Sequence, residues 1–177
     1  MRGSRYPSSK FLLPLAAALL TTVVYAAGSS LGTDDTDFLK KAAKGNLAEV
    51  ELGRLAAQKA TSPEVKEFGS RMVRDHTKAN HELSALAASK GVTVPTSISL
   101  GEDVSVAHLK MLSGKSFDDA YIKMMVDDHK EDVAAFERAS TGSQDMDVRR
   151  FGTKTLPTLQ SHLTKIEKIQ SDFGGTN

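Results

Sequence analysis

The sequence contains no cysteine and no tryptophan, and it has only three tyrosines. Without cysteine, the chain has no disulfides, no thiolate catalysis and no zinc or iron–sulfur site built on cysteine. A chain poor in aromatic residues and rich in alanine and leucine favours helices over a β-sandwich. Its 177 residues are enough for one domain and hardly for two. We therefore expect one all-α domain that is stable by packing alone.

Several functional motifs are also absent. The formal net charge is only +1 at pH 7, and there is no basic stripe, so nucleic-acid binding is not expected. The chain has no glycine-rich phosphate loop and no nucleophile elbow. The Glu-x-x-His signature of di-iron bundles is missing, because Val73 and Val126 stand three residues before His76 and His129.

Residues 1–26 have the pattern of a secretory signal peptide. Arg2, Arg5 and Lys10 precede an apolar run that is too short to span a bilayer comfortably, and small residues follow near Ala26, where we place cleavage. No cysteine is available there for a lipid anchor. Removal leaves 20 basic and 22 acidic residues and no transmembrane segment. The mature protein is therefore expected to be periplasmic or secreted; an uncleaved membrane anchor is the alternative.

The mature chain shows apolar residues at helical spacing in four long segments. We expect helices over about residues 36–59, 63–90, 116–140 and 145–173, and a short helix over 102–112 within a long connection at 92–115. Residues 27–34 are expected to form a flexible leader, 35–173 the bundle domain and 174–177 a disordered tail. The fold class predicted is an all-α, antiparallel four-helix bundle with a long connection between the second and third long helices.

Polar residues and prolines indicate where these helices begin and bend. The expected N-caps are Asp34 or Asp35 for the first helix, Ser62 for the second, and Ser116 with Asp119 as a capping box for the third. Pro157 is expected to interrupt and kink the last helix.

Three of the five histidines lie on the apolar faces of the predicted helices. His76, His129 and His162 each face inward on a different predicted helix, whereas His81 points away from its stripe and His108 lies in the long connection. The unit Met-Val-x-Asp-His occurs twice, at residues 72–76 and 125–129. Two interpretations are open: each histidine is a hydrogen-bonded core group, or the three converge on a metal ion, as inward side chains of helix bundles do.

Further side chains complete the candidate metal site. Glu49 and Asp132 fall on inner arcs and are candidate ligands beside the three histidines. Asp75 and Asp128 lie at stripe edges and suit the role of holding a histidine tautomer. Imidazoles with a carboxylate suit zinc, iron or manganese.

Copper is the fourth candidate metal. Met72 and Met125, each one turn before a histidine, suit copper as soft ligands. Core packing is the other interpretation of both methionines. With no metal at all, the protein has no cofactor.

The order of several segments resembles that of bacterial domain-of-unknown-function family 4142. The segments that carry the resemblance are Ala48-Glu49-Val50-Glu51-Leu52-Gly53, Phe68 with Met72-Val73-x-Asp75-His76, Leu112-Ser113-Gly114, Phe117-Asp118, Tyr121 to His129 with Phe136, and Leu156-Pro157 with His162-Leu163. The resemblance implies a ferritin-like bundle in an exported protein, often labelled an outer-membrane protein, and implies no function.

Three functional hypotheses follow. The first is a periplasmic metal-binding bundle that acts in metal handling or stress response. The second is a structural or interaction protein that binds no metal and catalyses nothing. The third, a mononuclear metal enzyme, needs an open coordination position that the sequence does not indicate. A homo-oligomer or a peripheral association with the cell envelope is compatible with each of them.

Overall fold

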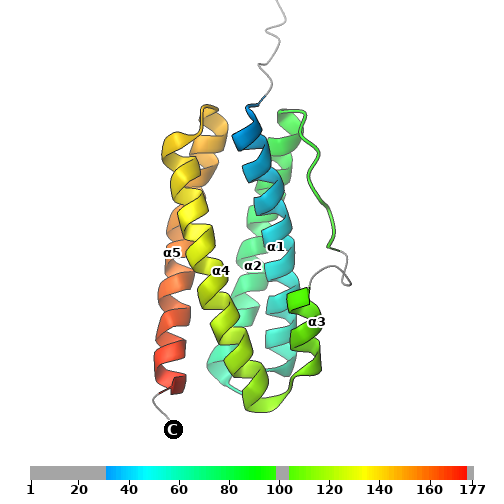
Figure 1. The fold of residues 1–177 in the computed structure, drawn as a ribbon, viewed down its shortest axis with the longest axis vertical. Helices are drawn as coiled ribbons and strands as arrows, with labels where there is room; N and C mark the ends of the chain where they lie inside the picture. Colours follow the sequence, from blue (N-terminus) through cyan, green and yellow to red (C-terminus); the bar gives the residue numbers. More distant parts are fainter. Residues whose placement is uncertain (1–30, 99–103, 175–177) are drawn as a thin grey trace, which may run out of the picture.

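The residues that the structure describes form four long helices and one short helix (Figure 1). The computed structural model describes residues 31–98 and 104–174. The helices are α1 (Thr33–Lys59), α2 (Pro63–Ser89), α3 (Val104–Met111), α4 (Gly114–Gly142) and α5 (Met146–Gly174). The predicted all-α bundle with a short helix in the long connection is confirmed. The predicted signal peptide lies outside the described residues, as do the last three residues of the predicted tail.

The helices pack as two antiparallel pairs, α1 with α2 and α4 with α5. The connection from α2 to α4 returns along the length of the bundle, so that α2 and α4 run in the same direction (Figure 1). One long crossover of this kind is the topology of ferritin-like bundles. No helix in the described part of the chain is long and apolar enough to cross a membrane.

Helix ends agree with the sequence prediction at α2 and differ at α1 and α4. Ser62 caps α2 by accepting a hydrogen bond from the backbone N–H of Val65. The predicted cap of the first helix by Asp34 or Asp35 is wrong. Helix α1 begins at Thr33, and the Asp35 carboxylate instead accepts a hydrogen bond from the backbone N–H of Asp145.

The capping box expected at Ser116 and Asp119 is also wrong. Helix α4 begins two residues earlier, at Gly114, whose φ of 58° is a conformation that glycine adopts at little cost. Asp119 therefore lies within the helix and pairs with Lys115. Helix α5 is continuous through Pro157, which does not end it. Pro157 is exposed, so its ring faces solvent rather than the core.

The core consists of two apolar clusters, one toward each end of the bundle. One cluster holds Phe68, Phe117 and Tyr121; the other holds Leu39 and Phe136. Along each of α2, α4 and α5, a buried histidine lies between residues of the first cluster and residues of the second. The fold thus places polar groups at its centre and apolar groups on either side of them.

Candidate metal centre

Three buried histidines meet at mid-height of the bundle. His76 on α2, His129 on α4 and His162 on α5 are 2%, 0% and 1% exposed. The distances between their ring centroids are 5.7 Å for His76–His129, 5.5 Å for His76–His162 and 5.4 Å for His129–His162. One nitrogen from each ring lies within 4.8 Å of the other two. The inward direction predicted from helical spacing is confirmed, and His81 is exposed as expected; His108 is exposed on α3.

His76 is oriented by an asparagine on α1. Its Nδ1 lies 2.9 Å from the side-chain oxygen Oδ1 of Asn46, itself buried. An amide oxygen only accepts hydrogen bonds, so Nδ1 of His76 carries the proton in the neutral ring. Nε2 is then a lone-pair donor, and it has no hydrogen-bond partner among the described residues.

His129 is oriented by its own helix. Its Nδ1 lies 2.9 Å from the carbonyl oxygen of Met125, one turn earlier. The carbonyl can only accept, so Nδ1 donates and Nε2 of the neutral ring holds a lone pair. The ring of Phe68 meets the His129 ring edge-on at 6.0 Å and the His162 ring at 6.3 Å, which closes the apolar side of the site.

His162 is oriented by a carboxylate. Its Nε2 donates to Oδ2 of Asp75 at 2.8 Å, and Asp75 also accepts from Nε of Arg71 at 3.3 Å. Arg71 in turn donates to the Ser161 hydroxyl. Burial acts to raise the pKa of Asp75, but the hydrogen bonds from His162 and Arg71 hold it below its ordinary value. An ionised Asp75 fixes the proton of His162 on Nε2 and leaves a lone pair on Nδ1.

These three assignments leave one nitrogen without a proton on each ring, within a cluster whose ligand atoms lie within 4.8 Å of one another. His129 Nε2 and His162 Nδ1 are 3.4 Å apart, and neither has a proton to donate to the other when the rings are neutral. Two nitrogen ligands at about 2.0–2.1 Å from a tetrahedral metal ion lie about 3.3–3.4 Å apart. The two nitrogens are thus already spaced as ligands of one ion, and His76 Nε2 is the third donor.

Burial keeps all three rings neutral. It lowers the pKa of His129 to about 4, with a further contribution from His162. Burial and the two neighbouring imidazoles hold the pKa of His76 well below its ordinary value. Burial also lowers the pKa of His162, although the hydrogen bond to Asp75 opposes this. Neutral imidazoles are the form that binds metal ions, so the donor set fits a transition-metal ion.

Glu49 lies beside His129, and Asp132 lies about one turn beyond His129 on α4; neither belongs to the cluster of three histidines. Glu49 is 3% exposed, and its Oε1 is 3.7 Å from His129 Nδ1, the nitrogen turned away from the other two rings. Neither carboxylate oxygen has a hydrogen-bond partner in the described part of the chain. Burial and the charges of Asp132 and Asp128 hold the pKa of Glu49 well above its ordinary value. Burial, with Asp128 and Glu131, raises the pKa of Asp132 to about 7.

Met72 and Met125 are both fully buried and belong to the apolar cluster around Phe68. The Met125 carbonyl accepts the hydrogen bond from His129 Nδ1. Packing in the core accounts for the burial of both side chains.

Two groups near the histidines were missed in the sequence. Asn46 lies seven residues after Leu39 and seven before Gly53, on the buried face of α1. Helical spacing could therefore have predicted that its side chain points inward. Tyr121 is buried with its hydroxyl unpartnered among the described residues, and burial raises its pKa well above the ordinary value. Because Tyr121 lies on the apolar face of its predicted helix, the sequence indicated only a role in core packing.

The chain belongs to a protein family that is recognised from its sequence. Residues 21–169 match the family described as Domain of unknown function (DUF4142), which confirms the resemblance noted in the sequence. No curated protein matches the chain.

Solved structures share the fold at low sequence identity. A DUF305 fragment from Deinococcus radiodurans is 13% identical with a TM-score of 0.69, over 80% of this chain and 98% of its own. CopM in its Cu(I)-bound form is 14% identical with a TM-score of 0.67, over 78% of this chain and 96% of its own. CopM is also known in Cu(II)-bound and Ag-bound forms. At these identities the likeness shows the fold alone.

Proposed function

We propose that this protein is an exported bundle that binds one transition-metal ion through His76 Nε2, His129 Nε2 and His162 Nδ1, and acts in metal handling in the cell envelope. The observation that carries the proposal is the pair of proton-free nitrogens 3.4 Å apart, with His76 Nε2 buried and unpartnered among the described residues beside them. Burying three polar groups without partners is costly, and one ion satisfies all three.

The donor set favours particular ions. Three imidazoles suit zinc, copper, iron and nickel, whereas magnesium and calcium prefer oxygen ligands. Divalent copper binds nitrogen sites more tightly than the other first-row ions. The fold shared with CopM, a protein known in copper-bound and silver-bound forms, supports testing copper first and zinc second.

The supporting groups have roles that follow from their contacts. Asn46, the Met125 carbonyl and Asp75 each hold one ring so that its lone pair points inward. Partners of this kind raise the basicity of the ligand and fix its orientation. Phe68 limits access of water from one side. A bound ion supplies positive charge at the centre of the bundle, and the ionised Asp75 offsets part of it.

Elemental analysis of the untagged mature protein, with competition titrations of Cu²⁺ and Zn²⁺, tests this function. We expect one ion per chain, and a His129→Gln variant that binds at least about 100-fold more weakly. The matched control is His81→Gln, because His81 is exposed on the same helix as His76. Binding should also raise thermal stability, by about 2.7 kcal/mol when free ion is at 100 times Kd.

Either of two results would contradict the proposal. If the mature protein binds no transition metal at micromolar concentration, the histidines are core groups and the protein is a structural or interaction bundle. Equal losses in His129→Gln and His81→Gln would place the ion elsewhere. Mass spectrometry of the exported protein tests the cleavage expected near Ala26.

A further inference from the structure

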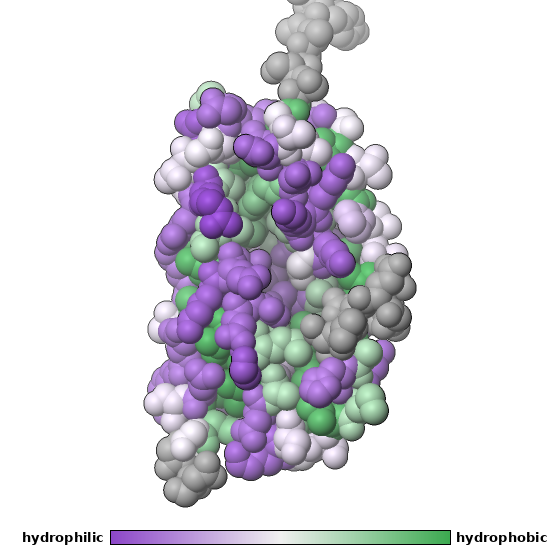
Figure 2. Space-filling model, viewed as in Figure 1, coloured by the Kyte–Doolittle hydropathy of each residue, from purple (hydrophilic) through white to green (hydrophobic). Residues whose placement is uncertain are grey.

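An open groove of about 800 Å³ lies between α1 and α4. It is lined on one side by the first turns of α1, around Phe38, and on the other by the second half of α4, around Phe136. The space-filling view shows this face recessed between the two helices, with hydrophilic residues along the edges of the recess and apolar residues on its floor (Figure 2). The groove therefore separates the two helix pairs at one end of the bundle.

The lining of the groove is acidic. It includes two cationic side chains, Lys41 and Arg138, and five carboxylates: Asp34, Asp35, Asp37, Glu131 and Asp132. A cleft lined with charge of one sign concentrates ions of the opposite sign and speeds their association. The excess of carboxylates therefore attracts cations to this face.

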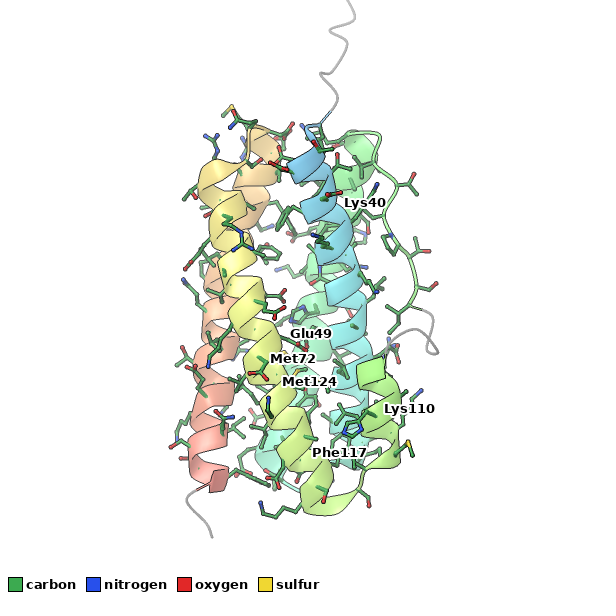
Figure 3. All side chains as sticks on the ribbon, in the orientation of Figure 1. Lys40, Glu49, Met72, Lys110, Phe117 and Met124 are labelled. Atoms are coloured by element: carbon green, nitrogen blue, oxygen red, sulfur yellow. The ribbon has the colours of Figure 1, made fainter. Side chains whose placement is uncertain are left out.

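Glu49 lies next to His129, two turns along α1 from the lining of the groove. It stands seven residues beyond Ala42, which lines the groove, and Figure 3 shows it between α1 and α4. Its carboxylate is buried, without a hydrogen-bond partner in the described ranges, and 3.7 Å from His129 Nδ1. Only the imidazole ring separates this carboxylate from Nε2, one of the three donors. A buried carboxylate without a donor has oxygens available for a cation.

On the opposite face of the bundle, a salt bridge lies over the site. There, between α2 and α5, Asp75 covers His162, and the guanidinium of Arg71 binds both Asp75 and Ser161. The charge of Asp75 is thus already paired with that of Arg71, which leaves it less available to an approaching cation. Of the two faces, the one between α1 and α4 is the favourable approach.

We infer that the groove between α1 and α4 is the path by which a hydrated divalent cation reaches the three histidines, and that Asp132 and Glu49 bind it in turn on the way. Asp132 lines the groove on α4, one turn from His129, and Glu49 is the last carboxylate before the imidazoles. This inference rests on the proposed function, since the path requires a destination. It assigns Glu49 and Asp132 a role in the rate of exchange and not in the final coordination.

Stopped-flow mixing with Co²⁺, whose visible absorption reports nitrogen coordination, tests the path on the full mature chain. Glu49→Gln and Asp132→Asn should each slow both uptake and release by about tenfold or more, because a carboxylate that can bind the ion along the path has been removed. Kd, measured separately with Co²⁺ and Zn²⁺ at equilibrium, should stay the same. The matched control is Glu137→Gln, an exposed carboxylate on α4 that lies outside the groove lining, and it should change neither rate.

Each other outcome overturns the inference. Unchanged rates in both variants, or equal slowing in Glu137→Gln, would mean that the groove is not the path. A weaker Kd in Glu49→Gln at an unchanged uptake rate would make Glu49 a ligand of the final site. In these cases the wild-type protein still binds the ion, so the proposed function stands. Absence of binding in the wild-type protein removes both proposals together.

Discussion

His129 Nε2 and His162 Nδ1 face each other across 3.4 Å at the centre of the bundle, and neither carries a proton in its neutral ring. The proton of each ring sits on its other nitrogen. His129 Nδ1 donates a hydrogen bond to the Met125 carbonyl, and His162 Nε2 donates one to Asp75. Two lone pairs at this distance repel each other. A metal ion or a single proton between them removes the repulsion, so the arrangement couples metal binding, protonation and stability.

This coupling predicts an acid-sensitive fold in the metal-free protein. The pKa of His129 is lowered from 6.5 to about 4, and those of His76 and His162 are also lowered. Below pH 6.5 the unfolded chain therefore binds more protons than the folded chain, and the free energy of unfolding falls as the pH falls. For His129 alone the loss approaches about 3 kcal/mol by pH 4, at about 1.4 kcal/mol per pH unit.

Urea unfolding between pH 7 and pH 4 measures this loss. Glu49 and Asp132 act in the opposite sense, because their pKa values are raised. The informative quantity is therefore the difference between the wild-type protein and His129→Gln at each pH. That difference should shrink as the pH falls through the range 6.5 to 4. A difference independent of pH would show that His129 has its ordinary pKa in the folded state.

The pH dependence of stability predicted for Asp132 has the opposite sign to that predicted for His129. Its pKa is raised to about 7 from 3.8, so between these values the folded state binds more protons than the unfolded state. Its ionisation therefore destabilises the fold as the pH rises through 7. We expect Asp132→Asn to stabilise the metal-free protein at pH 8 and to have little effect at pH 4, as measured by urea unfolding at both values. Equal effects at the two values would place its pKa in the ordinary range.

Asp75 should control metal affinity without contacting the ion. Replacing Asp75 by Asn keeps an acceptor for His162 but removes the charge that fixes the proton on Nε2. Loss of such a partner costs about 10- to 100-fold in metal affinity. The control is Glu82→Gln, because Glu82 is on the same helix, is equally exposed at 30%, and pairs with Lys154 as Asp75 pairs with Arg71. Competition titrations should show the loss in Asp75→Asn alone.

The sequence predicted the helices and the three histidines because both depend on spacing along one helix. Periodicity places His76, His129 and His162 on inner faces, but it does not give their relative heights, which depend on how the helix pairs align. Asp118 was unpredictable for a related reason. It lies on α4, and the groups it binds are in the turn between α1 and α2, 56 and 57 residues away. Such a contact depends on tertiary packing and leaves no local signal.

Close packing of α1 and α2 depends on two glycines. A Cβ added at Gly53 would lie 2.6 Å from the carbonyl oxygen of Gly69, and one at Gly69 would lie 2.7 Å from that of Gly53. Gly53→Ala should therefore force the helices apart and lower the free energy of unfolding by about 1–3 kcal/mol. The control is Gly45→Ala on the same helix, where nothing lies within 4 Å of the added atom.

Gly45→Ala should instead stabilise the protein by about 0.5–1 kcal/mol, because alanine favours the helix. Thermal unfolding of the two variants checks the contrast. The same sign for both would mean that helix propensity, rather than the contact between the backbones, dominates at Gly53.

Asp118 on α4 binds the turn that leads into α2, at the end of the bundle far from the groove. Its side chain is fully buried and accepts hydrogen bonds from the backbone N–H groups of Thr61 and Ser62 and from the Thr61 hydroxyl. In Asp118→Asn an amide nitrogen takes the place of one acceptor oxygen, which leaves a buried N–H without its partner. Losing charge-assisted bonds of this kind costs about 2–3 kcal/mol.

The neighbouring Asp119→Asn is the matched control for this last variant. Asp119 is 54% exposed and pairs only with Lys115 among the residues described, so its replacement should change stability by less than about 0.5 kcal/mol. Neither variant should alter metal affinity, because the helices hold the three histidines from both sides of mid-height. If Asp118→Asn weakened metal binding as well as the fold, the alignment of the two helix pairs would depend on this one carboxylate, and the donor geometry would be a consequence of the turn between α1 and α2.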